Sequence, residues 1–176
     1  MLRRLLLAIG VVFLVVVGAF AAIIAFDAPT APPVLAAGNA VPGIAQWNFA
    51  DLPKLQTVKA RDGAPLNYRV YPGRPDRAVV LVHGSSGTDT SMLKLGQALQ
   101  AAGATVYAIS LRGHGGSGTT NGDVSYGGQL DDDLADLIKG AGLDKPAVRR
   151  TLIGFSSGGG FALRIASGPH ASLFRD

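Results

Sequence analysis

Short β-rich runs that alternate with helical segments constrain the fold of this chain more than any other feature. Residues 78–82 and 105–109 are apolar runs typical of strands buried on both faces. The alternation predicts an α/β fold, with a mostly parallel sheet and helices on both faces. The first two strands, joined by a turn at Asp62-Gly63, are expected to form a hairpin. The expected strands are residues 55–60, 66–71, 78–82, 105–109 and 150–153, and the expected helices are residues 92–102, 130–141 and 161–166.

The composition excludes several classes of protein. With 48% hydrophobic and 16% charged residues, the chain is neither disordered nor fibrous. It contains no cysteine, which excludes a disulfide scaffold, a thiolate metal site and a cysteine nucleophile. The net charge is +4, and Arg3 and Arg4 account for two of these charges. The small remainder predicts no nucleic-acid-binding surface.

The amino terminus has the pattern of a membrane-spanning segment. Residues 5–26 are all apolar or glycine, and a helix of about 22 residues is about 33 Å long, against a hydrocarbon core of about 30 Å. Arg3 and Arg4 precede this run, and the next basic residue is Lys54. By the positive-inside rule, the amino terminus stays in the cytoplasm and everything after Phe26 is exported. Residues 1–26 are therefore predicted to be a membrane anchor.

A cleaved signal peptide is the alternative, with residues 19–21 (A-F-A) as its cleavage site. The apolar core of a signal peptide is usually about 7–15 residues long, so the longer run here favours the anchor. The anchor would hold the rest of the chain at the outer face of a membrane, whereas cleavage would secrete it. Residues 27–50, rich in alanine and proline, are expected to be a tether, and residues 51–176 the folded domain.

The sequence G-F-S-S-G, residues 154–158, directly follows the last expected strand and opens the last expected helix. A strand that turns at once into a helix forces the central residue, Ser156, into a strained conformation and leaves its hydroxyl clear of the sheet. Gly159 and Gly160 continue the glycine run, although each interior glycine costs a helix about 1 kcal/mol relative to alanine. This departure favours a site of close backbone approach over a flexible loop.

Three motifs together make the chain resemble the α/β-hydrolase superfamily over residues 55–166. The first is the elbow just described, and the second is H-G-S-S-G, residues 83–87, at the position of the family's oxyanion loop. The third is S-L-R-G-H-G-G-S-G, residues 110–118, which is similar to the family's segment D-x-R-G-x-G-x-S. Ser110 stands where the family often has aspartate, so that residue's usual ion pair with Arg112 is expected to be missing. The loop is expected to be structural.

The resemblance implies a serine hydrolase, and the sequence gives no sign of a cofactor. By position, Ser156 is similar to the family's nucleophile, and the backbone N–H groups of Ser157 and Ser85 are similar to the two donors of its oxyanion hole. The chemistry agrees, because a serine hydroxyl needs a base to remove its proton and the oxyanion needs fixed donors. A serine at the elbow argues against the haloalkane dehalogenase and epoxide hydrolase branches, which are known for aspartate there.

None of the three histidines is an evident base. In the family the acid and then the base follow the nucleophile, whereas His170 and Asp176 follow Ser156 here in the reverse order. We expect His170 to lie a helix length from the Ser156 hydroxyl, His83 to order the oxyanion loop and His114 to be a surface or loop-packing residue.

A metal site has little support in the sequence, because no histidine pair has ligand spacing. The acidic run 131–133 opens a helix, where the helix dipole and solvent exposure explain it better than a bound metal ion does.

The sequence is thus expected to be the amino-terminal part of a longer, membrane-anchored serine hydrolase. The expected reaction is cleavage of a carboxylic ester, including lipid-like esters, outside the cytoplasm. A domain that stops after the elbow leaves residues 150–153 at an open sheet edge, so the piece is expected to be poorly stable and inactive. A serine peptidase, a thioesterase or an acyltransferase stays open. The alternative from another class is a non-catalytic, membrane-tethered binding protein or an inactive fragment.

Overall fold

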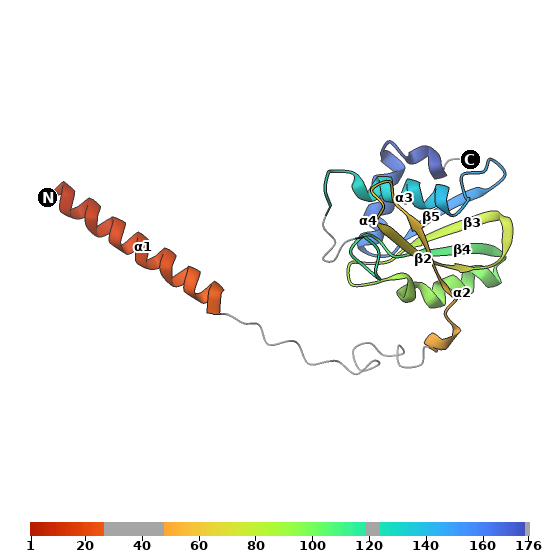
Figure 1. Cartoon of the computed structure of the whole chain (residues 1–176), viewed down its shortest axis with the longest axis horizontal. Coiled ribbons are helices and arrows are strands. Elements are labelled where there is room, and N and C mark those ends of the chain that lie inside the picture. Colours follow the sequence, from red (N-terminus) through yellow and green to blue (C-terminus); the bar gives the residue numbers. More distant parts are fainter. Residues whose placement is uncertain (27–47, 119–123, 175–176) are drawn as a thin grey trace. The chain divides into compact units, whose positions relative to one another are not determined.

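The computed structural model describes residues 1–26, 48–118 and 124–174 (Figure 1). The chain divides into two units, Met1–Trp47 and Asn48–Asp176, and each is described by itself.

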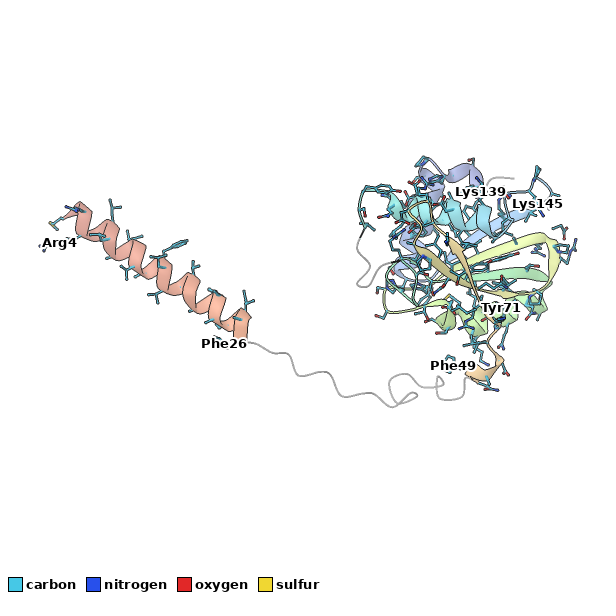
Figure 2. All side chains as sticks on the ribbon, viewed as in Figure 1. Arg4, Phe26, Phe49, Tyr71, Lys139 and Lys145 are labelled. Atoms are coloured by element: carbon cyan, nitrogen blue, oxygen red, sulfur yellow. The ribbon has the colours of Figure 1, made fainter. Side chains whose placement is uncertain are left out.

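In the described part of the first unit, a single long helix is present, α1 (Leu2–Phe26). Its side chains are exposed on every side between Arg4 and Phe26, which Figure 2 labels. A helix that is apolar all round cannot present a polar face to water while it packs on a soluble core. The stretch Arg3–Phe26 is long and apolar enough to cross a membrane, a property that it shares with signal sequences.

The second unit follows the predicted alternation of strands and helices. Every predicted element forms, with ends that differ from the expectation by a few residues. The strands are β1 (Leu55–Lys59), β2 (Pro65–Tyr71), β3 (Arg74–Val82), β4 (Ala104–Ile109) and β5 (Arg149–Gly154). The α-helices are α2 (Leu93–Ala101), α3 (Gln129–Gly140) and α4 (Ser157–Ser167), and the short 3₁₀ helices are η2 (Phe49–Asp51), η3 (Asp89–Met92) and η5 (Ala171–Phe174).

The strands form one sheet in the order β1-β2-β4-β3-β5. The hairpin of β1 and β2 is antiparallel, and β2 also runs antiparallel to β4. β3 lies between β4 and β5 and is parallel to both, with its Val80 opposite Tyr107 and Leu152. The carboxyl ends of these three strands therefore meet at one edge of the sheet, where open α/β sheets bind ligands. Among the described residues, β5 has a neighbouring strand on one side only.

Helices cover both faces of this sheet, as the sequence predicts (Figure 1). α3 and α4 lie on one face, where Leu134 and Phe161 join Val80 and Val82 of β3 in the main apolar core. α2 lies on the opposite face against β4 and β2. The predicted α/β architecture, with a mostly parallel sheet, is confirmed.

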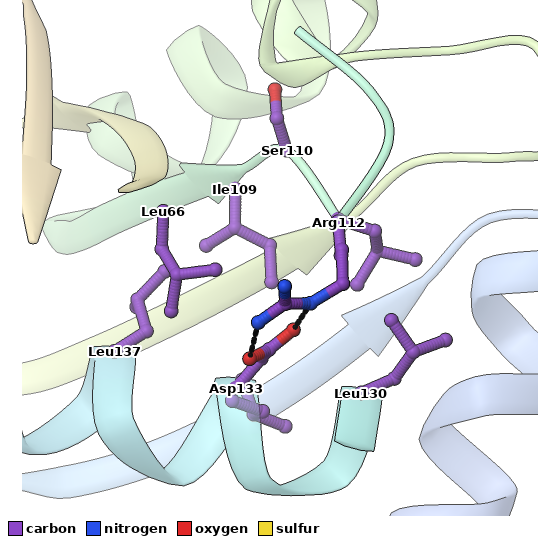
Figure 3. A pocket seen from close by; sticks show the side chains of 9 residues that line it. Leu66, Ile109, Ser110, Arg112, Leu130, Asp133 and Leu137 are labelled. Atoms are coloured by element: carbon purple, nitrogen blue, oxygen red, sulfur yellow. Dashed lines mark hydrogen bonds and ion pairs between the residues drawn. The ribbon is translucent and has the colours of Figure 1, made fainter. Parts of the chain in front are cut away.

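Two acidic side chains at the start of α3 are buried, so the expectation that this acidic run is exposed to solvent is wrong. Asp131 and Asp133 are 4% and 6% exposed. Asp133 accepts two hydrogen bonds of 2.7 Å from the Arg112 guanidinium (Figure 3). Asp131 accepts a hydrogen bond of 2.8 Å from Arg164. Each carboxylate is buried because an arginine from another element neutralises it. In the described part of the chain, no group of three or more His, Cys, Asp or Glu could hold a metal ion.

Arg112 has two acidic partners that the sequence motif does not reveal. Among the described residues, the guanidinium pairs with Asp133 at 2.7 Å and with Asp62 at 3.0 Å, and the Ser110 hydroxyl donates to Asp89 instead. The hydrogen bond from Arg112 holds the pKa of Asp62 below its usual value. An ion pair between residue 110 and Arg112 was expected to be missing. Carboxylates from α3 and from the β1–β2 turn take its place as partners of Arg112.

Candidate active site

Ser156 lies between the end of β5 and the start of α4 in a conformation that few non-glycine residues adopt. Its φ is 54° and its ψ is −119°, and among the described residues it is the one non-glycine residue with positive φ. Such a conformation costs about 1–3 kcal/mol and persists only where the surrounding structure imposes it. The Ser156 side chain is exposed and does not cap α4. The turn therefore presents an exposed hydroxyl that does not cap the helix it precedes.

Two glycines of the elbow are required by close backbone contacts. A Cβ atom on Gly154 would lie 1.9 Å from the Gly158 carbonyl oxygen. A Cβ on Gly158 would lie 2.5 Å from the His83 carbonyl oxygen and 2.6 Å from that of Val82. α4 thus begins directly against the end of β3. A Cβ on Gly160 would meet nothing within 4 Å, so close approach does not explain the whole glycine run.

The loop that follows β3 faces Ser156. A Cβ atom on Gly84 would lie 3.3 Å from the Ser156 Cβ. The Gly84 carbonyl oxygen accepts hydrogen bonds from Nδ1 of His83 at 2.6 Å and from the Gly87 N–H at 2.9 Å. In a trans peptide the N–H points away from the carbonyl. The Ser85 N–H therefore points away from the His83 side of the loop.

The backbone N–H groups of Ser85 and Ser157, expected from the resemblance to form an oxyanion hole, bind no acceptor within the described residues. Ser157 is the first residue of α4, where amide N–H groups lack an intrahelical acceptor. Neither this N–H nor that of Ser85 has a hydrogen-bond partner among residues 48–118 and 124–174. The structure thus brings Ser156, Ser157 and the Gly84–Ser85 peptide to the carboxyl edge of the parallel strands.

His83 has no ring nitrogen left to act as a base. Nδ1 donates to the Gly84 carbonyl oxygen, and Nε2 accepts from the Leu111 N–H at 3.1 Å. The side chain is buried, and burial lowers its pKa because the charged imidazolium is disfavoured there. His83 therefore joins the loop after β3 to the loop after β4, in agreement with an ordering role.

The other two histidines are also engaged. His170 pairs with Asp132 at 2.9 Å, and it lies beyond the carboxyl end of α4, whose amino end carries Ser156. Eleven helical residues span about 16 Å, which exceeds the hydrogen-bond reach that a base requires. Nε2 of His114 lies 2.9 Å from the Ser85 carbonyl oxygen. Nδ1 lies 3.3 Å from the Arg112 carbonyl oxygen in its own loop, as expected of a loop-packing residue, but the contact with the loop after β3 was not predicted.

The sequence did not predict a buried carboxylate, Asp89, that follows the loop after β3. Asp89, 2% exposed, accepts a hydrogen bond of 2.6 Å from the Ser110 hydroxyl and pairs with Arg69 of β2. The Asp89 N–H in turn donates to the Ser110 hydroxyl at 2.9 Å. The carboxylate beside Ser110 therefore comes from the start of η3, at the far end of the loop after β3. The only signal in the sequence is an acid that starts η3, which is equally typical of an exposed helix start.

A family model described as serine aminopeptidase, S33, matches residues 73–174, more than half of the chain. The chain belongs to this family of α/β hydrolases. A curated relative, the monoacylglycerol lipase of Mycolicibacterium smegmatis, is 35% identical over 86 residues, which are 49% of this chain and 31% of the relative. The chain therefore spans about a third of the length of this relative.

Solved structures support the same fold. The epoxide hydrolase A of Mycobacterium thermoresistibile matches with a TM-score of 0.58 and 27% identity, over 69% of this chain and 37% of that chain. An α/β hydrolase from Sphaerobacter thermophilus matches with a TM-score of 0.51 and 33% identity, over 64% of this chain and 40% of that chain. The resemblance stated from the three motifs is confirmed.

Proposed function

We propose that this α/β hydrolase is a serine hydrolase in which Ser156 attacks the carbonyl carbon of a carboxylic ester. The observation that carries the proposal is the placement of the Ser156 hydroxyl. It is exposed on a strained turn, faces the Gly84 loop and takes no part in capping α4. Backbone strain that holds an otherwise unused nucleophile in place is typical of catalytic sites.

In the proposed reaction, Oγ of Ser156 bonds to the carbonyl carbon while a base takes the hydroxyl proton. The carbonyl electron pair moves onto oxygen, and the N–H groups of Ser85 and Ser157 stabilise the resulting oxyanion. The intermediate then expels the alcohol, which receives the proton, and an acyl group remains on Ser156. Water attacks this acyl-enzyme, releases the carboxylic acid and restores the hydroxyl.

In this proposal the base lies outside the described residues. His83 has both ring nitrogens engaged, His114 contacts the Ser85 carbonyl and His170 pairs with Asp132. None of these rings has Ser156 as a hydrogen-bond partner in the described part of the chain. The matched relatives extend well beyond the aligned region, which is 31% to 40% of their lengths.

The proposed substrate is an ester with an apolar acyl or alcohol group. The printed activity of the mycobacterial relative, a monoacylglycerol lipase, supports this choice. Phe155, next to Ser156, is 65% exposed, and its ring lies 3.4 Å from the position of a Cβ on Gly84. An exposed aromatic ring beside the nucleophile suits an apolar chain. We further propose that α1 anchors the domain at the outer face of a membrane, close to lipid esters.

A non-catalytic binding protein is the second candidate. One observation favours it, namely that no described histidine contacts the Ser156 hydroxyl. A serine without a base is a poor nucleophile.

The test uses the full chain in detergent with p-nitrophenyl butyrate, with and without imidazole as a diffusible base. We expect p-nitrophenol release above that of Ser156→Ala only when imidazole is present. Ser167→Ala is the matched control, because the Ser167 hydroxyl bonds to the Leu163 carbonyl at the other end of α4. Equal release by the wild type and Ser156→Ala in both conditions would favour the binding protein. Ser156-dependent turnover without imidazole would place a working base within this chain.

A further inference from the structure

His114 connects two loops at the candidate active site. Nε2 of His114 lies 2.9 Å from the Ser85 carbonyl oxygen, although the two residues are 29 positions apart. Nδ1 lies farther, at 3.3 Å, from the Arg112 carbonyl oxygen. Because a carbonyl oxygen only accepts, the shorter contact assigns the hydrogen to Nε2. The His114 ring also lies against that of His83, with 4.9 Å between the ring centroids.

The two peptides that flank the Cα of Ser85 are held by different histidines. The Gly84 carbonyl, in the peptide that contains the Ser85 N–H, is bound by His83 and by the Gly87 N–H. The Ser85 carbonyl, in the next peptide, is bound by His114. Glycine rotates freely, and this loop has Gly84 and Gly87 on either side of two exposed serines. Without the hydrogen bond from His114, only the peptide before the Ser85 Cα would be held, and the peptide after it would be free to turn.

The segment that carries His114 is itself firmly anchored. Arg112, two residues before it, is 4% exposed and paired with Asp133 and Asp62. Gly115, directly after it, has a φ of 55°, and a Cβ there would lie 2.4 Å from the Ser110 hydroxyl oxygen. A donor on such a segment keeps its position when the opposite loop moves.

We propose that His114 is a positioning residue, which fixes the direction of the Ser85 N–H toward the oxyanion by binding the Ser85 carbonyl. The inference rests on the proposed function of Ser156. The effect of His114 on the order of the oxyanion loop can be measured by amide hydrogen exchange, which does not depend on catalysis.

The test compares three variants of the full chain in detergent. His114→Phe keeps an aromatic ring against His83 but removes the donor, and His114→Gln restores a donating N–H. His170→Phe is the control, because that ring pairs with Asp132 instead of the loop. Two quantities are measured, the rate of Ser156 labelling by a fluorophosphonate in the presence of imidazole, and the amide hydrogen exchange of residues 83–88.

We expect His114→Phe to slow labelling about tenfold, less than the 10²–10³-fold loss for a deleted oxyanion donor, and to speed exchange in residues 83–88. The apparent affinity for the reagent should stay the same, so the loss falls on the maximal labelling rate. His114→Gln should recover most of both properties, and His170→Phe should match the wild type. If His114→Phe exchanges and labels like the wild type, the positioning role is wrong. If no protein is labelled but exchange rises as expected, Ser156 fails as nucleophile while the hold on the loop stands.

Discussion

Gly84 and Ser156 face each other across the carboxyl edge of the parallel strands, so closely that a Cβ on Gly84 would lie 3.3 Å from the Cβ of Ser156. The two residues follow β3 and β5, which are neighbours in the sheet. The sheet thereby sets the proposed nucleophile beside a loop whose Ser85 N–H has no hydrogen-bond partner among the described residues.

Gly158→Ala is expected to destabilise the domain by about 1–3 kcal/mol, the usual range for overpacking a rigid site. Its Cβ would lie 2.5 Å from the His83 carbonyl oxygen, and backbone cannot easily move aside. Gly160→Ala is the matched control on the same helix turn, where a Cβ meets nothing within 4 Å. It should leave stability unchanged or raise it by up to about 1 kcal/mol. Urea unfolding followed by circular dichroism measures the free energy of unfolding of both variants. Equal losses would contradict the close approach of Gly158 to the His83 carbonyl.

Arg112→Leu is expected to destabilise the domain by about 3–5 kcal/mol, because it leaves the carboxylate of Asp133 buried without a partner. The Arg112 side chain is 2% exposed and that of Asp133 is 8% exposed. Arg74→Leu is the control, since its pair with Asp76 is exposed to solvent on both sides. Thermal unfolding should show a large loss for the first variant and none for the second. A small loss for Arg112→Leu would mean that the ion pair does not hold the loop after β4.

Ser110→Asp is expected to destabilise the domain, although the family often has aspartate there. The Ser110 hydroxyl donates to the Asp89 carboxylate at 2.6 Å, so the substitution would set two carboxylates against each other. The exchange of both residues, Ser110→Asp with Asp89→Ser, should recover part of the stability because the two positions again hold one carboxylate and one hydroxyl. The pairing of residues 89 and 110 is tested by the urea midpoints of unfolding of the single and double variants at pH 7. A double variant no more stable than Ser110→Asp would argue against this pairing.

Stability is expected to fall as the pH drops below about 6.5, the ordinary pKa of histidine. Burial lowers the pKa of His83 in the folded state, so below 6.5 the unfolded chain binds a proton that the folded chain does not. The loss continues until the pH passes the lowered pKa of the folded state. His83→Gln should show a shallower slope of unfolding free energy between pH 7 and pH 5. Equal slopes for the wild type and His83→Gln would contradict the attribution of this pH dependence to His83.

The fold and the place of Ser156 follow from the sequence because both depend on local patterns. Apolar runs define β3, β4 and β5, and the carboxyl ends of parallel strands must share an edge. The elbow motif G-F-S-S-G at residues 154–158 lies at that edge for the same reason. These features need no knowledge of which side chains meet.

The side-chain pairs around the site could not be predicted in the same way. Arg112 with Asp133, Ser110 with Asp89 and His114 with Ser85 join residues at least 21 positions apart in the chain. Loop residues have no periodicity that fixes where they point, and an acidic run at a helix start looks the same whether exposed or buried. For this reason the sequence indicated exposed carboxylates in α3, where two of them are buried.

The most direct test of the account is the site of covalent modification by a fluorophosphonate in the full chain, with imidazole present. Tryptic mass spectrometry should locate the adduct on Ser156, and Ser156→Ala should abolish it while Ser157→Ala, which keeps the backbone N–H, should not. An adduct on another serine, or equal labelling of the wild type and Ser156→Ala, would contradict the assignment of Ser156 as the nucleophile.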